Sequence, residues 1–279
     1  MKTTELTREQ MAALAPAELR LLNRKGQWPE HGTTQFCCRG YTQHTIVVLP
    51  RDWAADFFLF CQRNPRPCYI ADVTDPGSPH PMLLALEADV RTDVSRYRVF
   101  RDGEAADEPR DILKYWRDDL MTFFLPCSFS FEGMLRDAHV EFRHIGLYET
   151  DIPTRPAGRF VSVPVMATGR VFRNSHDAVR ASAITTRYPV SHGHPIHIGN
   201  PPPGYRNISH TTDWTAPPSD AAASSGEVAL FHACAYTAET AIKAARPPFA
   251  MMHVINNLFV SDRRVEEFAC GLDAGAAMP

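Results

Sequence analysis

The chain has 279 residues, 44% of them hydrophobic and 22% charged, and a formal net charge of −3. This composition predicts a soluble globular protein of one large or two modest domains, and its charge does not favour nucleic acid as a partner. No Lys/Arg cluster or apolar run of ~20 residues favours a membrane, and the charged N-terminal segment lacks the apolar stretch of a signal peptide. Seven scattered cysteines are not a disulfide framework, so we expect reduced thiols in the cytoplasm.

The first half of the chain predicts both helices and strands. Thr7–Gln10 has a capping-box pattern, and Pro16 is expected to open a second helix. The run 45–50 predicts a buried strand, and 51–62 a helix with an apolar face. Asp102-Gly103 indicates a hairpin, and 111–125 predicts a further helix that Pro126 ends.

The second half alternates in the same way. Strands are expected at 161–172, 228–236 and 249–260, and helices at 175–188 and 237–245. This alternation predicts an α/β protein with a layered, mixed-sheet core. We expect a main domain of residues 1–145 plus 225–279, with a smaller α/β subdomain at 146–224.

A short pattern occurs twice along the chain. When Cys127 is aligned with Cys234, Ser130 aligns with Thr237 and Glu132 with Glu239. An apolar run precedes each cysteine, and a histidine follows at His144 and His253. We infer two strand–turn–helix–strand units related by a pseudo-twofold axis, a possible internal duplication.

Two interpretations of this repeated unit stay open. Ser130 and Thr237 stand where a helix N-cap hydroxyl belongs, and the two glutamates would favour the helix dipole. A cysteine at a helix N-terminus would also have a stabilised thiolate, and the backbone N–H groups there bind carboxylates. We expect helix caps in the first place, with a binding site for a small acid built on them as the functional interpretation.

Two further segments could contribute polar groups to a site. Arg63, Asn64 and Arg66 alternate with prolines after a predicted helix, and arginine suits bidentate carboxylate binding, although a rigid solvated loop fits equally well. His192, His194 and His197 lie within six residues but lack an acidic or cysteine partner at a recognisable spacing. We therefore expect hydrogen-bonding or acid–base histidines, and no metal.

Several stretches resemble the D-glutamate cyclase family, whose members are also described as hydro-lyases. They include "GYTQHTIVVLPRDWAADFFLFCQRNPRPC", "RTDVSRYRVFRDGE", "CSFSFE" and "HIGNP", spread over residues 40–262. The resemblance implies a two-part α/β fold and an enzyme that removes water as D-glutamate closes to 5-oxoproline. It implies no redox cofactor.

The resemblance also suggests site residues. Catalytic roles are expected for Cys127, Ser128, Glu132, His197 and His253. Substrate binding is expected for the remaining members of the set, namely Arg63, Asn64, Arg66, Ser130, Tyr148, Glu149, His192, Cys234 and Asn257.

The chain departs from the family pattern at a few positions, which makes it a divergent member. Glu149 stands where the family has arginine, Asn257 where it has a closing histidine, and His232 where it has tryptophan. If Glu149 lined the site, its charge would repel a second substrate carboxylate. We therefore expect a substrate altered from D-glutamate.

The leading hypothesis is a cofactor-independent, water-eliminating lyase acting on a small amino or carboxylic acid, with homo-oligomer formation left open. One alternative is a two-cysteine racemase or epimerase, in which Cys127 and Cys234 would take and return an α-proton. Another is a non-catalytic binder of small acids.

Overall fold

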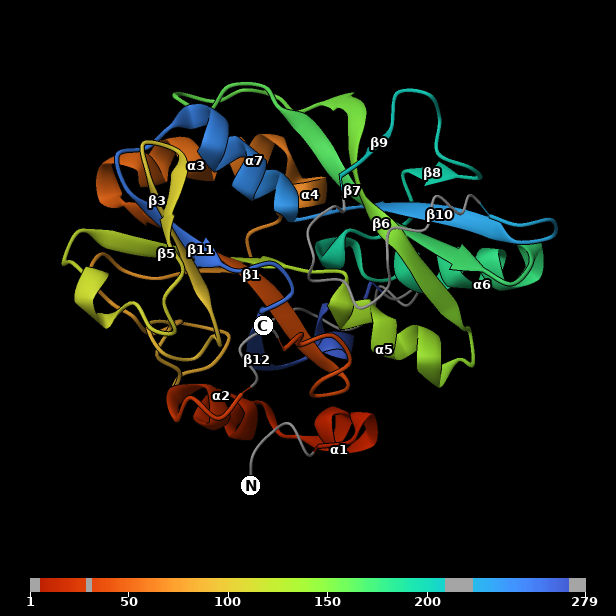
Figure 1. Cartoon of the computed structure of the whole chain (residues 1–279), viewed down its shortest axis with the longest axis horizontal. Helices are drawn as coiled ribbons and strands as arrows, with labels where there is room; N and C mark the ends of the chain where they lie inside the picture. The colour runs from red at the N-terminus through yellow and green to blue at the C-terminus, as the bar shows by residue number, and fades with distance from the viewer. Residues whose placement is uncertain (1–5, 29–31, 209–222, 271–279) are drawn as a thin grey trace.

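Two antiparallel sheets lie side by side and form the framework of the molecule (Figure 1). The computed structural model describes residues 6–28, 32–208 and 223–270. Within them, the first sheet contains β1 (Tyr41–Pro50), β2 (Asp72–Val73), β3 (Tyr97–Arg101), β4 (Glu104–Asp107), β5 (Leu120–Pro126), β11 (Ala250–His253) and β12 (Phe259–Arg264). The second contains β6 (Phe142–Pro153), β7 (Pro164–Phe172), β8 (His197–Ile198), β9 (Arg206–Asn207) and β10 (Val228–Ala233).

Within the described residues, the two sheets have seven and five strands. The strand order is β2-β5-β1-β11-β3-β4 in the first, where β12 also pairs with β1, and β8-β10-β7-β6-β9 in the second. β11 and β12 pair with different halves of the long strand β1, at Val47–Val48 and at Tyr41–His44 respectively.

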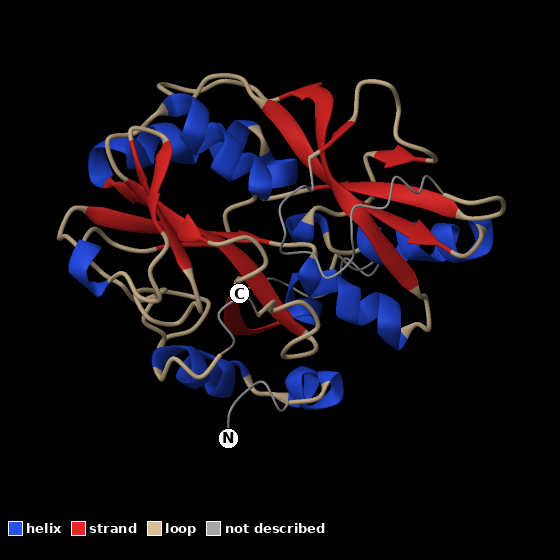
Figure 2. Ribbon diagram, in the orientation of Figure 1, coloured by secondary structure: helices blue, strands red, loops and turns tan. Residues whose placement is uncertain are grey.

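Helices cover these sheets, as Figure 2 shows. The α-helices are α1 (Arg8–Ala13), α2 (Pro16–Arg24), α3 (Arg51–Arg63), α4 (Pro65–Cys68), α5 (Phe129–Asp137), α6 (Ser175–Thr186) and α7 (Tyr236–Ala245). Short 3-10 turns lie at η2 (Leu113–Tyr115), η3 (Pro189–Ser191) and η4 (Val265–Phe268). The apolar sides of α3 and α7 form one core with the first sheet, and those of α5 and α6 form another with the second.

Two crossovers join the sheets. α5 follows β5 of the first sheet, packs on the second and leads into β6, whereas α7 follows β10 of the second sheet, packs on the first and leads into β11. The expected α/β class is confirmed. The expected mixed sheet is wrong, because all pairings of the described strands are antiparallel. Each crossover connects two different sheets. The strands before and after it are therefore not neighbours in one sheet, and no parallel pair forms.

One predicted helix is wrong. Residues 111–125 form only the turn η2 and then β5, which pairs along its whole length with β1. The side chains of Leu120, Phe123, Phe124 and Leu125 are all buried, on both faces of the sheet. The periodicity of a run this apolar cannot show whether it forms a strand or a helix. Pairing within the sheet decides its conformation.

Most other predicted elements are confirmed. The capping box of α1 is formed, α2 begins at Pro16, and Asp102-Gly103 turns between β3 and β4. The predicted strand 249–260 is interrupted at 254–258, between β11 and β12. The division into domains stays a prediction, as does the duplication; β6 and β10 both belong to the second sheet.

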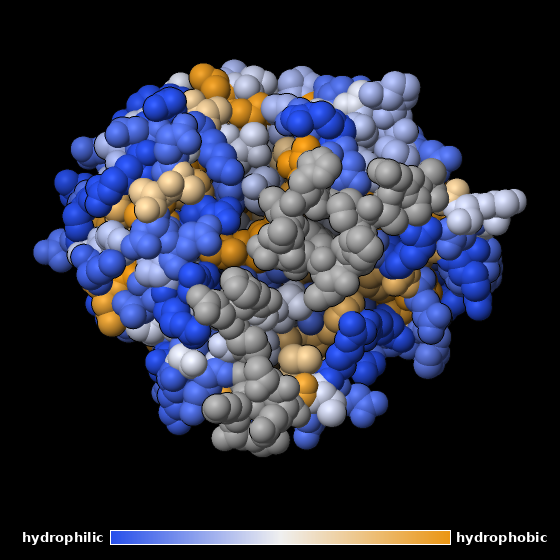
Figure 3. All heavy atoms as spheres, in the orientation of Figure 1, coloured by the Kyte–Doolittle hydropathy of each residue, from blue (hydrophilic) through white to orange (hydrophobic). Residues whose placement is uncertain are grey.

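The face shown in Figure 3 is mostly hydrophilic, with hydrophobic residues in separate small groups. Among the described residues, no helix combines the length and the apolar character needed to cross a bilayer.

Candidate active site

The two cysteines of the repeated pattern line the same pocket. Cys127 lies between β5 and α5, and Cys234 between β10 and α7, so each occupies the start of a crossover. The crossovers run in opposite directions and bring both thiols to the junction of the sheets. The pocket is lined by Thr45, Cys127, Ser128, Phe129, Leu147, Thr168, Cys234, Tyr236, Glu239, Met252, His253, Ile255, Asn256 and Leu258.

The backbone holds the two cysteines in equivalent ways. The N–H of Cys127 donates to the carbonyl oxygen of Gln43, and the N–H of Cys234 to that of Met166, both at 2.8 Å. Gln43 and Met166 lie on β1 and β7, the strands that pair with β5 and β10. The alignment of Cys127 with Cys234 therefore has a structural counterpart.

Ser130 and Thr237 bind strands and do not cap helices. The Oγ of Ser130 accepts from the N–H of Gln43 at 3.0 Å, and the Oγ1 of Thr237 accepts from that of Met166 at 2.9 Å. Both residues lie inside the first helical turn, and the N-cap residues are Ser128 and Ala235, neither with a side-chain cap. The predicted N-caps are wrong, because the hydroxyls satisfy the neighbouring strand instead.

Burial keeps both thiols protonated. It raises the pKa of Cys127 to about 12 and also raises the pKa of Cys234, in each case against a smaller opposing effect of a backbone N–H. The expected stabilisation of a thiolate is therefore wrong for the protein as it stands. Both side chains therefore enter the pocket as neutral thiols, and a neutral thiol is a weak nucleophile.

His253, at the end of β11, offers a basic nitrogen to the pocket. Its Nδ1 lies 2.7 Å from the carbonyl oxygen of Val254, which can only accept, so Nδ1 carries the proton. Its Nε2 is buried without a hydrogen-bond partner in the described part of the chain. Burial lowers the pKa of His253 to about 4, so the ring is neutral at pH 7 and Nε2 can accept a proton.

Glu239 supplies a carboxylate to the lining of the same pocket. Its Oε1 lies 2.6 Å from Nζ of Lys243 and 3.1 Å from Nη1 of Arg98. The hydroxyl of Tyr236 donates to the same oxygen at 3.1 Å. Burial, followed by the charge of Glu239, raises the pKa of Tyr236 well above its usual value, so its phenol stays protonated.

Glu132 lies behind the cysteine pocket in a buried ion pair with Arg170. The Nη2 of Arg170, on β7, donates to Glu132 Oε1 at 2.6 Å and to Ser128 Oγ at 2.7 Å. Burial alone would raise the pKa of Glu132, but His144 and Arg170 outweigh it and lower that pKa to about 2. Glu132 is thus a permanent carboxylate that fixes Arg170, which in turn orients Ser128.

Several buried nitrogen atoms near this pair lack partners among the described residues: Nη1 of Arg170, Nε2 of His192 and Nδ1 of His232. The guanidinium of Arg170 and the ring of His232 each lie 5.1 Å from the ring of Phe131. Burial, with Arg170 as a further cause, keeps the pKa of both histidines low. The interior beside Ser128 therefore holds several polar nitrogen atoms whose hydrogen bonds are not satisfied by the described residues.

The segment that contains Arg63, Asn64 and Arg66 lies outside the cysteine pocket. Nη1 of Arg63 donates to the carbonyl oxygen of Pro156 at 2.5 Å, and Nη2 of Arg66 donates to that of His194. Asn64 exchanges hydrogen bonds with the backbone of Arg155 at 2.8 Å in each direction. These contacts with the backbone fit a structural role, which was one of the two interpretations, but the segment is the junction of α3 and α4 and not a loop.

Four other predicted site residues also lie outside the cysteine pocket. Nε2 of His197, on β8, contacts the carbonyl oxygen of Asn200, and His192 binds that of Arg66 through Nδ1. Tyr148 packs against Phe231 within the second sheet, and Glu149 pairs with Arg206 at 2.8 Å with 32% of its side chain exposed.

Asn257 is buried just beyond the pocket and accepts a hydrogen bond from Ser95. Neither it nor Glu149 lines the pocket, so the argument for an altered substrate loses its structural basis.

Sequence reasoning missed Arg170, gave Glu239 only a helix-dipole role and gave Tyr236 no role. A signal for Arg170 existed, since it is a charge within the apolar run 161–172, and a buried charge requires a partner. Among the described residues no group of three or more His, Cys, Asp or Glu side chains could hold a metal ion.

The fold and the pocket define an α/β protein whose site is suited to acid–base chemistry, with protonated thiols, a neutral imidazole and a carboxylate. A family model described as D-glutamate cyclase matches residues 121–262. A protein of Bacillus licheniformis is 41% identical over 91% of this chain and 97% of its own length, and one of Bradyrhizobium diazoefficiens is 43% identical over 89% and 91%. Both carry the name "putative hydro-lyase". The chain therefore belongs to the D-glutamate cyclase family.

Proposed function

We propose that this protein is a water-eliminating lyase acting on a small amino or carboxylic acid, with D-glutamate the first substrate to test. Family membership supports the reaction class. The position of Glu149 and Asn257 outside the pocket removes the reason to expect a different acid.

Ring closure of D-glutamate joins its nitrogen to the carbon of its own side-chain carboxyl group. A C–N bond forms and a C–O bond breaks, and the two protons that the ammonium nitrogen loses are those that the departing oxygen gains as water. The reaction therefore needs one group that accepts a proton and one that donates. Nε2 of His253 is unprotonated and the thiol of Cys127 carries a proton, and both line one pocket, so we assign acceptance to His253 and donation to Cys127.

The observation that carries this proposal is the tautomer of His253, whose Nε2 is left unprotonated, buried and without a partner among described residues. The test is to incubate the protein with D-glutamate and detect 5-oxoproline by mass spectrometry as a loss of about 18 daltons. His253→Gln should lower kcat by roughly 10²–10⁴-fold. His197→Gln is the matched control, and we expect it to leave kcat unchanged. Turnover that survives His253→Gln would contradict the proposed role.

A second candidate is an amino-acid racemase, favoured by the presence of two cysteines in one pocket. Such an enzyme needs one thiolate as base, and the raised pKa values of both thiols oppose it. Reaction in deuterium oxide separates the candidates. Deuterium at the α-carbon of recovered substrate would indicate a racemase, and water loss without exchange a lyase. A ligand-induced rise in melting temperature with neither outcome would indicate a binder.

A further inference from the structure

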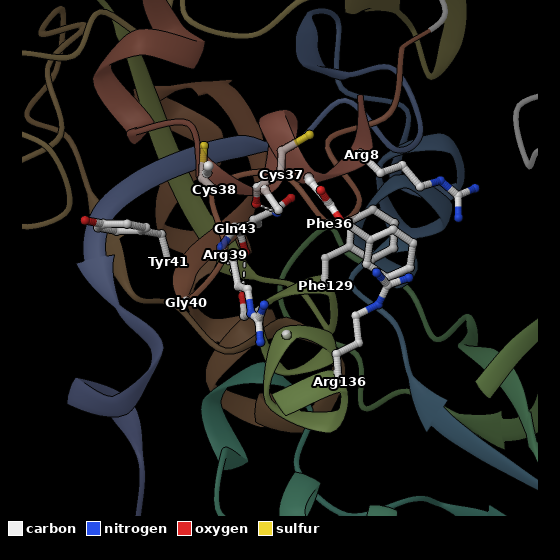
Figure 4. Close-up of a pocket in the computed structure, with 15 residues that line it drawn as sticks. Arg8, Phe36, Cys37, Cys38, Arg39, Gly40, Tyr41, Gln43, Phe129 and Arg136 are labelled. Carbon is white, nitrogen blue, oxygen red and sulfur yellow. Dashed lines mark hydrogen bonds between the residues drawn. The ribbon is translucent and has the colours of Figure 1, made fainter. Parts of the chain in front are cut away.

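A second cavity adjoins the cysteine pocket and carries a different chemistry (Figure 4). Its volume is about 410 Å³, within the range of ligand sites, whereas that of the cysteine pocket is about 40 Å³. The cysteine pocket has room for water but must open to admit an amino acid. Phe129 is the residue that lines both spaces.

The outer cavity is basic. Arg8, Arg39 and Arg136 line it together with a single acid, Glu9. Arg39 is paired with Asp137, but for Arg8 and Arg136 no ion pair is found within the described ranges. Burial lowers the pKa of Arg136; the charge of Glu132 opposes this effect, and the charges of Arg8 and Arg39 add to it. A cleft lined by excess positive charge concentrates small anions.

The cavity wall is held in place. The guanidinium of Arg136 lies 3.5 Å from the centre of the Phe36 ring, a cation–π contact that fixes its position. Phe36 and Cys38 have positive φ angles of 67° and 48°, and non-glycine residues adopt these only under constraint. The side-chain amide of Gln43 donates to the carbonyl oxygens of Thr34 and Cys37, which secures this loop.

The partition between the two spaces is a small apolar cluster. Phe129 packs with Cys127 and Leu258, and both of these line only the inner pocket. The loop of the outer wall is also tied to the inner one, because the N–H of Thr34 donates to the carbonyl oxygen of Asn256 at 2.9 Å.

We propose that the arginine-lined cavity is a docking site for small organic acids and that the Phe129 side chain is the gate through which they enter the cysteine pocket. This inference rests on the proposed function for its choice of ligand class. It assigns Arg136 to the capture of a carboxylate and Phe129 to the control of access.

Alkylation of Cys127 tests both assignments without any turnover. The rate is followed by peptide mass spectrometry with iodoacetate, an anion, and with iodoacetamide, a neutral molecule of similar size. Arg136→Gln should slow iodoacetate by about two- to fivefold, the effect of one partly exposed charge, and leave iodoacetamide unchanged. Arg246→Gln, an exposed arginine of the first-sheet side, is the control and should change neither rate.

Phe129→Ala should raise the rate with both reagents several-fold. Leu258→Ala removes a side chain from the same cluster without joining the two cavities, so it should not reproduce this gain. Equal effects of Arg136→Gln on both reagents, or equal effects of Phe129→Ala and Leu258→Ala, would overturn the inference. A failure to convert D-glutamate would instead overturn the proposed function and leave these rates as expected.

Discussion

The residue on which the interior beside the site depends most is Arg170. It is fully buried, and Glu132 is its ion-pair partner in the described structure. Removing one member of a buried pair leaves the other charge without compensation. The ion pair therefore holds Ser128 in position, because the Oγ of Ser128 accepts a hydrogen bond from Arg170.

Arg170→Met should therefore lower the free energy of unfolding by about 3–5 kcal/mol, as should Glu132→Gln to a similar degree. The double replacement Glu132→Leu with Arg170→Met should recover much of the loss, because no lone charge remains. Urea denaturation measures all three. Arg263→Met breaks the exposed pair with Glu267 and should change stability by less than about 1 kcal/mol. A double variant as unstable as the sum of the singles would contradict this account.

At the scale of elements, the hydroxyls of Ser130 and Thr237 join each crossover helix to a strand. Thr237→Val would leave the buried N–H of Met166 without its acceptor, so we expect a loss of about 1–3 kcal/mol. Thr240→Val, on the same helix, removes only a long contact of 3.4 Å to Tyr236 and should cost much less. Thermal and urea unfolding of the two variants would settle the comparison, and equal losses would show that the strand contact is unimportant.

The sequence predicted elements with a clear local signal and failed where tertiary pairing decides. The capping box at Thr7 and the Asp102-Gly103 turn are properties of a few neighbouring residues, and both are confirmed. The strand β5 is apolar on both faces, so its conformation depends on β1, some 70 residues earlier in the chain. The same distinction between local signals and tertiary pairing holds for the residues of the site. The repeated pattern identified both cysteines, but the distance of His197 and Glu149 from them depends on how the sheets are joined.

At the scale of the whole molecule, buried neutral histidines make stability depend on pH. Burial lowers the pKa of His44 to about 3 and those of His192 and His253 to about 4. In the unfolded chain each would bind a proton near pH 6.5. Between these limits the unfolded state holds more protons, so stability falls as the pH falls, by up to about 1.4 kcal/mol per pH unit for each histidine.

Glu132 adds to this dependence at lower pH. Its folded pKa of about 2 is below the unfolded value of about 4.3, so its contribution is complete above that value and is lost as pH falls towards 2. Urea denaturation at pH 7, 6 and 5 should show the histidine effect alone. His44→Asn should reduce the slope by about one proton, and the exposed His176→Asn should not. A slope that His44→Asn leaves unchanged would contradict the assignment.

The position of β11 has a consequence for synthesis on the ribosome. β11 lies between β1 and β3 in the first sheet, yet it comes from near the C-terminal end of the chain. Until those residues emerge, the β3–β4 hairpin has no place beside β1, and the nascent chain presents unpaired strand edges. Such late, long-range pairing is slow and exposes the chain to aggregation. Since His253 ends β11, it reaches the cysteines in the same event that completes the sheet, so the pocket is assembled only when the scaffold is finished.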